Sequence, residues 1–555
     1  MTLKNQPVPI PNKKTTTRKN KNGTQYIYYT IRAYRNKKGK PTSQVISIGK
    51  KDPNTNMLIP NRNYHDLFPQ TTTTTPPQTT TTKKEKEKTT IQTIQSIGTT
   101  TALNHIANQL QLTQTLQTTF PTNHTQLLTT AQYILCKGNI ISYIEDWLNQ
   151  TKTQLPTNQP FNDIHASKLF ATINPEEKTD FFTNWIKTRK DKEYHAYDVT
   201  SLSTHSNNLE LAEWGYNRDH DLLPQINMGL YYGVTTHIPT YYALYNGSIP
   251  DKSYLEFMMT TAQKAGLNTI SLILDRIFVT EDNFNYLFKN KYDFVTALAA
   301  SRVEARRLVD ENKLEVRKSA NRILGFDIYG VKRPLDLYGH RVWAHIYFDA
   351  EKQAFDEKAL FARIERLEVE LLDMNKPCKR VAKRFREYFK VEMSSKKEDM
   401  CEQRSEMSFV LDGGLVDKCL GRTGFFILLS SSEVLSCGEV LSLYRERDVI
   451  EKGFYAFKCG LDFRRVRVHL NRTLEGKVFV GFLSLILRSY MVYVLRSCVE
   501  TKHLSFEKVL LELEKVRVVT LDDKTQMITP LTKLQRAILE TLKVPLDALT
   551  THSTT

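Results

Sequence analysis

The segment from Tyr444 to Lys458 carries four polar side chains whose types and spacing suit chemistry on a phosphate ester. They are Tyr444, Arg447, Glu451 and Lys458, and the last three lie 3, 7 and 14 residues after the first. On a helix of about 3.6 residues per turn these offsets fall within roughly 60° of one another, so one helix face would carry all four. A carboxylate can hold a metal ion while neighbouring cations hold phosphate groups. A solvated, charged helix face would show the same pattern.

Two carboxylates upstream strengthen the chemical interpretation. Asp198 lies in the middle of an apolar and β-branched run, and Asp275 ends a second apolar run. A charged side chain inside a strand is costly unless it is paired or bound to a metal. The carboxyl end of a strand is where α/β folds place their sites. Together with Glu451, these residues could converge on two divalent metal ions, and carboxylate oxygens suit Mg²⁺ or Mn²⁺.

The surrounding sequence predicts the elements that would position these side chains. Strands are expected at 194–202, twice within 228–249, at 268–278 and at 292–300, with helices at 251–265 and from residue 284. This β-β-β-α-β-α-β order is that of an RNase H-like fold. A further strand at 424–430 precedes the motif helix, whose apolar residues could anchor it to a core. The predicted fold class is therefore α/β, an RNase H-like mixed sheet flanked by helices.

Composition and patterning divide the chain into seven predicted regions. They are a basic tail and β-hairpin region that could contact DNA or serve only solubility (1–70, hairpin at 25–49), a Thr/Pro-rich linker (71–89), a helical domain (90–190), the first part of the RNase H-like catalytic domain (191–300), an α+β insertion domain (301–423), the second part of the catalytic domain with the motif helix (424–500) and a C-terminal helical region with a tail (501–555).

The overall composition favours a polyanionic partner. The 555 residues carry a formal net charge of +17, which suits nucleic acid, although a generally basic protein is the alternative.

The cysteines and the apolar segments give further expectations. The seven cysteines form no C-x-x-C pair, so we expect neither a zinc site nor a disulfide framework. We expect the thiols to be reduced, as in an intracellular protein. The first residues contain no apolar run typical of a secretory signal. The apolar stretch 478–495 is interrupted by Arg488, so it predicts a buried core helix rather than a membrane span.

These motifs resemble those of insertion-sequence DDE transposases, in the branch defined by a Y-x₂-R-x₃-E-x₆-K signature. Tyr444, Arg447, Glu451 and Lys458 match that signature at every spacing. YDVTSLS around Asp198 and LILDR around Asp275 resemble the first and second acidic motifs of the family. The resemblance runs from about residue 24 to about residue 500. Ile277 is a departure, because relatives often have glycine there.

The resemblance implies a role for each of these residues. Asp198, Asp275 and Glu451 would bind two Mg²⁺ or Mn²⁺ ions, and Arg447 and Lys458 would hold phosphates of the transposon end. Tyr444 would donate a hydrogen bond to a phosphate near the cleaved position. Arg276, directly after a metal ligand, could touch DNA or form a salt bridge.

The implied function is a DNA transposase that cuts the ends of its element and joins the 3′-hydroxyls to target DNA. Its partners would be transposon-end inverted repeats and target DNA, bound by a homodimer, with no membrane. The expected location is the cytoplasm of a prokaryote, close to the nucleoid.

Two alternative functions stay open at the sequence level. Thr and Asn dominate the chain up to about residue 300, and Arg, Glu, Val, Ser and Cys dominate afterwards. That change is compatible with an inactive or domesticated protein that binds transposon ends without cutting them. An RNase H-like nuclease without strand transfer is the other alternative.

Overall fold

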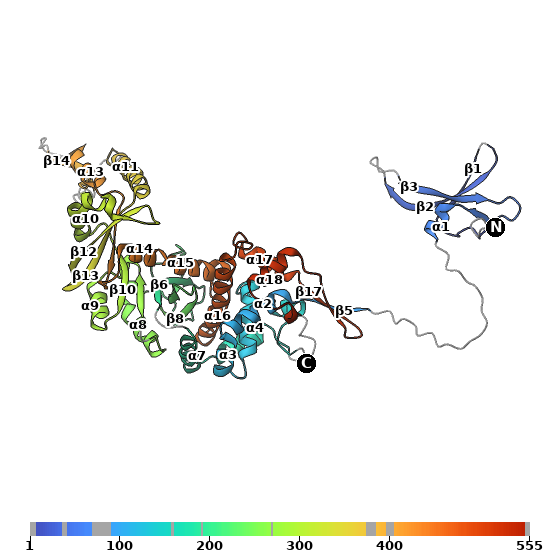
Figure 1. Cartoon of the computed structure of the whole chain (residues 1–555), viewed down its shortest axis with the longest axis horizontal. Coiled ribbons are helices and arrows are strands. Elements are labelled where there is room, and N and C mark those ends of the chain that lie inside the picture. The colour runs from blue at the N-terminus through green and yellow to red at the C-terminus, as the bar shows by residue number, and fades with distance from the viewer. Residues whose placement is uncertain are drawn as a thin grey trace, which may run out of the picture. The chain divides into compact units, whose positions relative to one another are not determined.

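The computed structural model describes residues 7–20, 22–35, 41–68, 90–156, 160–189, 193–267, 270–372, 385–395 and 405–549. It divides into two compact units, Met1–Lys88 and Thr89–Thr555 (Figure 1). The predicted linker at 71–89 lies outside the described residues.

The smaller unit is an antiparallel sheet with one short helix. Its elements are β1 (Thr15–Lys19), β2 (Gln25–Arg35), β3 (Pro41–Lys51), β4 (Leu58–Pro60) and α1 (Arg62–Leu67), with the strands in the order β1-β2-β3-β4. Strands β2 and β3 pair as the predicted hairpin, which is confirmed. Strand β1 adds an edge strand within the stretch that the sequence indicated only as a basic tail. Ile27, Ile48 and Leu58 form the buried core.

A nine-stranded mixed sheet forms the centre of the larger unit (Figure 1). In spatial order its strands are β11 (Arg322–Ile323), β12 (Ile328–Leu337), β13 (His340–Phe348), β16 (Phe425–Ser430), β10 (Asp293–Leu298), β9 (Ser271–Leu274), β6 (Tyr194–Ser203), β7 (Gln225–Gly233) and β8 (Pro239–Asn246). Strands β6, β9 and β10 run parallel, whereas β7 and β8 are antiparallel neighbours. Every residue of β7 is buried, as expected for a central strand covered on both faces.

The predicted order of strands and helices is confirmed. Helix α8 (Leu255–Lys264) separates β8 from β9, and α9 (Glu281–Lys289) separates β9 from β10. Short 3₁₀ turns complete the described elements: η2 (Ile141–Tyr143), η3 (Asp251–Ser253), η4 (Arg276–Phe278), η5 (Ser319–Asn321) and η7 (Leu546–Leu549).

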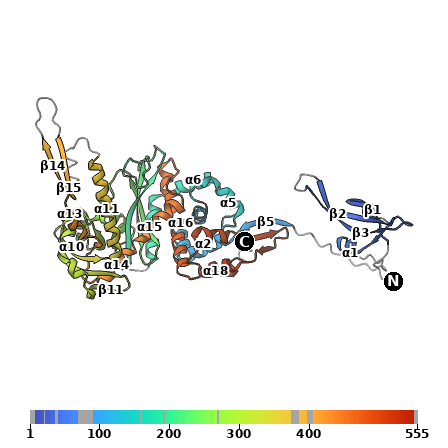
Figure 2. The same cartoon turned by 90° about the horizontal axis from the view of Figure 1, so that it is seen from above.

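The segment predicted as an insertion, 301–423, contributes strands to this same sheet. Strand β13 pairs with β16 from Trp343↔Ser430 to Phe348↔Phe425, and β12 and β11 continue outward from it. Its other elements are α10 (Val303–Val316), α11 (Ala350–Leu372), β14 (Phe389–Ser395), β15 (Ser405–Leu411) and α13 (Gly413–Leu420). The β14–β15 hairpin and α11 lie at one end of the unit (Figure 2). The boundaries of an insertion domain stay a prediction.

Helices from both ends of the larger unit pack together. They are α2 (Gly98–Gln109), α3 (Leu112–Thr119), α4 (His124–Lys137), α5 (Ile144–Gln150), α6 (Asp163–Thr172), α7 (Pro175–Lys187), α16 (Asn471–Arg496), α17 (Phe506–Glu514) and α18 (Lys533–Thr541). Strand β5 (Ile91–Ser96) pairs with β17 (Arg517–Leu521), which pairs with β18 (Gln526–Ile528). The sequence predicted neither this small sheet nor the pairing of distant segments that it requires.

Helix α16 connects the helical region to the central sheet. It contacts α4 and α6 on one side and β8 on the other (Figure 1). By length and composition alone it could cross a membrane, but 78% of its most apolar 18-residue window is buried inside the protein. The predicted buried core helix is therefore confirmed.

Gly476→Ala tests the tight packing of α16 against α6. A Cβ atom at this position would lie 2.1 Å from the backbone carbonyl oxygen of Phe170, which cannot rotate away. Alanine favours a helix over glycine by about 1 kcal/mol, but overpacking costs about 1–3 kcal/mol. We expect the larger effect to win and the thermal midpoint to fall. Arg472→Ala, at an exposed position of the same helix, is the control, and an unchanged midpoint in Gly476→Ala would contradict the packing.

Candidate active site

Two neighbouring parallel strands bring the two predicted aspartates side by side. Tyr197 of β6 pairs with Leu274 of β9, and Asp198 and Asp275 are the next residues on each strand. Because the residues before them are paired in register, the two aspartates lie next to each other, Asp198 within β6 and Asp275 directly after β9. Asp275 also accepts a hydrogen bond at Oδ1 from the Ile277 N–H, at 3.0 Å. Ile277, the departure from the family pattern, is 41% exposed.

Glu451 reaches the same region from α15 (Asp448–Tyr455), which packs against β6 and β7. Val449, Ile450 and Phe454 are the buried residues that anchor this helix. Three carboxylates therefore come from two strands and one helix, as the sequence predicted.

The prediction of one continuous helix through the motif was wrong. Helix α14 (Cys437–Arg445) ends before Arg447, α15 begins after it, and η6 (Ala456–Gly460) is a π-helical turn. A π turn inserts an extra residue, so Lys458 no longer follows the 3.6-residue register. Offsets counted along the sequence cannot detect either change.

The Arg447 guanidinium lies among all three carboxylates. Its Nη1 is 3.7 Å from Asp198 Oδ2 and 3.4 Å from Asp275 Oδ2, and its Nη2 donates a hydrogen bond to Glu451 Oε1. Carboxylates gathered this closely repel one another, and an opposite charge within about 4–6 Å stabilises their ionised forms. Arg447 thus offsets the repulsion within the cluster.

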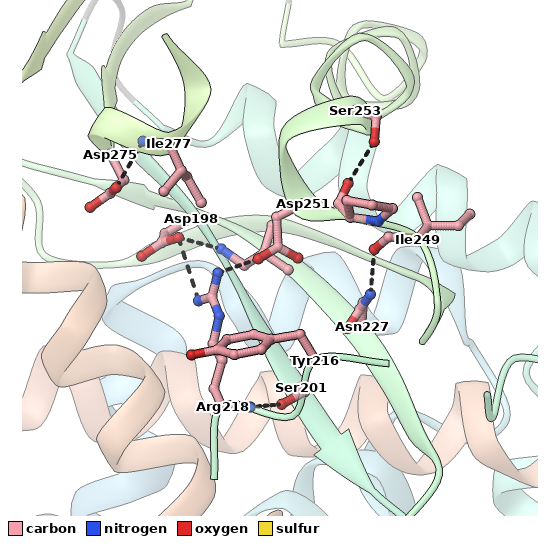
Figure 3. Close-up of polar contacts among 12 residues, drawn as sticks. Asp198, Ser201, Tyr216, Arg218, Asn227, Ile249, Asp251, Ser253, Asp275 and Ile277 are labelled. Atoms are coloured by element: carbon pink, nitrogen blue, oxygen red, sulfur yellow. Dashed lines mark hydrogen bonds and ion pairs between the residues drawn. The ribbon is translucent and has the colours of Figure 1, made fainter. Parts of the chain in front are cut away.

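A second arginine, Arg218, was not predicted from the sequence, and it pairs with the other carboxylate oxygen of Asp198 (Figure 3). Arg218 Nη1 is 3.6 Å from Asp198 Oδ1, and its Nη2 donates a hydrogen bond to Asp251. The Val199 N–H also donates to Asp198 Oδ1 at 2.8 Å. The available signal was the charged run NRDHD at 217–221, placed between two predicted strands.

Burial is the largest influence on the pKa of Asp198, and it raises that pKa. Its side chain is 12% exposed, and burial raises its pKa from 3.8 to about 6. Arg218, the Val199 N–H and Arg447 act in the opposite direction, whereas the neighbouring Asp275 raises the pKa further.

Lys458 is present at the site but already paired. Its Nζ lies 2.7 Å from Asp219 Oδ2, and both side chains are largely buried. In the same loop Asp221 Oδ2 lies 2.6 Å from Arg465 Nη1. A cavity of about 370 Å³ opens here. Its charged lining consists of Asp198, Arg218, Asp219, Glu451, Lys458 and Arg464.

Tyr444 lies near Arg447, and Arg276 directly follows Asp275; neither residue lines the cavity. The Tyr444 ring centroid is 5.7 Å from the Arg447 guanidinium, and burial raises the pKa of its phenol. Arg276 is exposed in the turn that follows Asp275.

A family model described as the transposase DDE domain matches residues 190–487. The chain belongs to this family. The match contains Asp198, Asp275, Glu451 and the segment between the two predicted catalytic parts. The protein is accordingly a DDE transposase, a class that acts in DNA transposition and recombination.

Comparisons with individual proteins add little to this assignment. A solved piggyBac transposase synaptic complex with hairpin DNA is similar at a TM-score of 0.32 and 10% identity, covering 74% of this chain and 70% of its own. No curated protein matches the transposase in sequence.

Family membership implies a divalent metal ion, and the donor chemistry of the transposase fits one. Asp198, Asp275 and Glu451 supply only carboxylate oxygens, which suit Mg²⁺ or Mn²⁺. Among the described residues, no three His, Cys, Asp or Glu side chains lie close enough together to share one ion. The carboxylates instead surround the cationic Arg447 guanidinium, whose charge occupies the middle of the cluster.

Asp198→Asn should stabilise the metal-free transposase in a pH-dependent way. Because the folded pKa of about 6 exceeds the ordinary 3.8, ionisation of Asp198 costs the folded state free energy. That cost is absent below about pH 4, grows as pH rises and is complete above about pH 6. We expect the substitution to add about 1–3 kcal/mol at neutral pH and little near pH 4.

Urea unfolding in EDTA at both pH values measures this difference. Asp448→Asn is the matched control, because Asp448 is exposed on the neighbouring helix α15. A loss of stability in Asp198→Asn at neutral pH would contradict the origin of the pKa shift.

Proposed function

We propose that this chain is an insertion-sequence transposase of the branch with the Y-x₂-R-x₃-E-x₆-K signature. It cuts the ends of its element and joins the 3′-hydroxyls to target DNA. The observation that carries the proposal is the convergence of Asp198, Asp275 and Glu451 on Arg447, beside a cavity lined by further cations.

The three carboxylates would hold two Mg²⁺ or Mn²⁺ ions. When bound, such ions activate a water or a 3′-hydroxyl and stabilise the leaving oxygen. Arg447 then pairs with a DNA phosphate in place of the carboxylates, so that its charge stays compensated. The half-buried Arg218 helps to orient Asp198 and to keep it ionised through its contact with Asp198 Oδ1.

The remaining motif residues would position the DNA. Lys458 and Arg447 hold phosphates of the transposon end, and Tyr444 donates a hydrogen bond near the cleaved position. Arg276, which is exposed, contacts the backbone of the DNA.

Partners and setting follow from this function. The DNA partners are terminal inverted repeats and target DNA, bound by a homodimer, in the cytoplasm of a prokaryote close to the nucleoid. The RNase H-like class is supported by the β8-β7-β6-β9-β10 order, with β6, β9 and β10 parallel.

Glu451→Gln tests the proposed chemistry directly. The change keeps the shape and removes the charge, so we expect cleavage to fall at least about 100-fold while DNA binding persists. The assay is nicking of a labelled duplex that carries the element's terminal repeat, with Mg²⁺ or Mn²⁺. Glu446→Gln, at an exposed position between α14 and α15, is the control.

The same assay separates the alternative functions. Binding without nicking by the wild-type protein would favour an inactive remnant. Nicking without joining to a second duplex would favour a nuclease. Full strand transfer by Glu451→Gln would contradict the proposed role of this carboxylate.

Asp219→Asn tests whether the loop at 217–221 competes with DNA for Lys458. Asp219 Oδ2 lies 2.7 Å from the Lys458 ammonium group, at the position where a phosphate would otherwise bind. Neutralising Asp219 should raise the affinity for duplex DNA several-fold. The slope of the logarithm of the binding constant against the logarithm of salt concentration should become steeper by about one. Binding is measured by fluorescence anisotropy in EDTA, so that no cleavage intervenes.

The control for this prediction is Asp310→Asn in α10. Asp310 is likewise paired with an arginine, Arg422, but neither residue lines the cavity. Equal affinity gains in both variants would indicate a general effect of net charge and contradict competition at Lys458.

A further inference from the structure

The positive charge of the chain is concentrated in its smaller unit. Residues 1–88 contain 18 lysine and arginine and 4 aspartate and glutamate side chains, a formal charge of +14 out of +17. The larger unit, which contains the candidate active site, is therefore close to neutral for its size. Attraction toward a polyanion resides mainly in the first 88 residues.

One face of the small sheet is occupied by its own core. Ile27, Ile48 and Leu58 are buried there. Phe68, just after α1, contacts Tyr29 at a ring-centroid distance of 5.3 Å and Tyr64 at 5.0 Å. This face is therefore at least partly covered by α1 and Phe68.

The opposite face combines aromatic rings with cations. Opposed residues in an antiparallel sheet point to the same side, and Arg18 is opposite Tyr26, which is opposite Lys50. The Arg18 guanidinium lies 4.9 Å from the centroid of the Tyr28 ring, and Lys50 Nζ lies 5.8 Å from that of Tyr26. We call this surface the Tyr26–Tyr28 face.

No carboxylate interrupts the charge of this sheet. Strands β1 to β4 contain no aspartate or glutamate. Arg18 and Lys50 are exposed, whereas Tyr26 and Tyr28 are half-buried beneath them. Cations held on aromatic rings at an open surface lose little conformational freedom when they bind an anion.

We propose that the Tyr26–Tyr28 face is a binding surface for the sugar–phosphate backbone of duplex DNA. Arg18 and Lys50 each contact a phosphate, and the two tyrosines hold those cations in place and cover the adjoining sugars. The choice of DNA among polyanions rests on the proposed function, whereas the surface itself rests on charge and geometry. Contacts of this kind bind without reading sequence, so they attach the transposase to any duplex.

The test is the affinity of the full-length chain for a random-sequence duplex of about 30 base pairs, in EDTA. The double variant Arg18→Ala and Lys50→Ala should bind at least about tenfold more weakly at low salt, with the salt slope reduced by roughly 2. The charge-retaining pair Arg18→Lys and Lys50→Arg should bind nearly as the wild type does, which controls for folding.

Arg62→Ala is the matched control within the same unit. The Arg62 side chain is 94% exposed but lies on α1, outside the Tyr26–Tyr28 face. We expect less than about a twofold change in its affinity. If Arg62→Ala lost as much binding affinity for each removed charge as the double variant does, the proposal would be overturned. The overall charge of the unit, rather than this face, would then explain the binding.

The nature of the partner is tested with the same variants. If the double variant lost affinity for single-stranded RNA or for polyglutamate but kept its affinity for duplex DNA, the choice of DNA would be overturned. Neither metal nor cleavage enters this experiment. Failure of the cleavage assay would therefore bear on the proposed function, and failure here would bear on the Tyr26–Tyr28 face alone.

Discussion

The mutual repulsion of three carboxylates at one edge of a sheet is the constraint on which the rest of the site depends. Parallel pairing of β6 with β9 fixes Asp198 beside Asp275, and the packing of α15 brings Glu451 to them. Cations placed among such carboxylates reduce this repulsion. Arg447 lies between Asp198 and Asp275, and Arg218 contacts the other oxygen of Asp198, so that this buried aspartate in a central strand has two cationic partners.

The same compensation extends outward to the residues that would meet DNA. Asp219 and Asp221 pair with Lys458 and Arg465, so the loop at 217–221 supplies two carboxylates to two cations. Two of the cations at and beside the cavity, Lys458 and Arg465, are thus paired within the protein. In the proposed function, DNA phosphates replace these carboxylates at Lys458 and Arg465, whereas the strands that form the Tyr26–Tyr28 face contain no aspartate or glutamate. We therefore propose that different parts of the chain attract the DNA and position it.

Local signals in the sequence were enough to predict the elements that carry the acidic residues. Apolar runs located β6 and β9, and a single carboxylate within or after each run identified Asp198 and Asp275. The break before α15 and the π turn at η6 were not predictable, because a residue count contains no record of where the helical register changes.

Long-range pairings were also beyond local patterns. Strand β13 joins β16 across some 80 residues, and the NRDHD loop contributes Arg218 through tertiary packing alone. Periodicity describes which face of an element is buried, not which distant element covers it. Arg218 was therefore missed although its charged run was visible in the sequence.

Electron paramagnetic resonance of bound Mn²⁺ shows whether Asp198, Asp275 and Glu451 form one metal site. We expect the wild-type protein, bound to its terminal-repeat duplex, to give the spectrum of two coupled Mn²⁺ ions about 4 Å apart. Asp275→Asn should abolish the coupling. A spectrum of isolated Mn²⁺ ions in the wild type, unchanged by Asp275→Asn, would contradict the claim that these carboxylates act together.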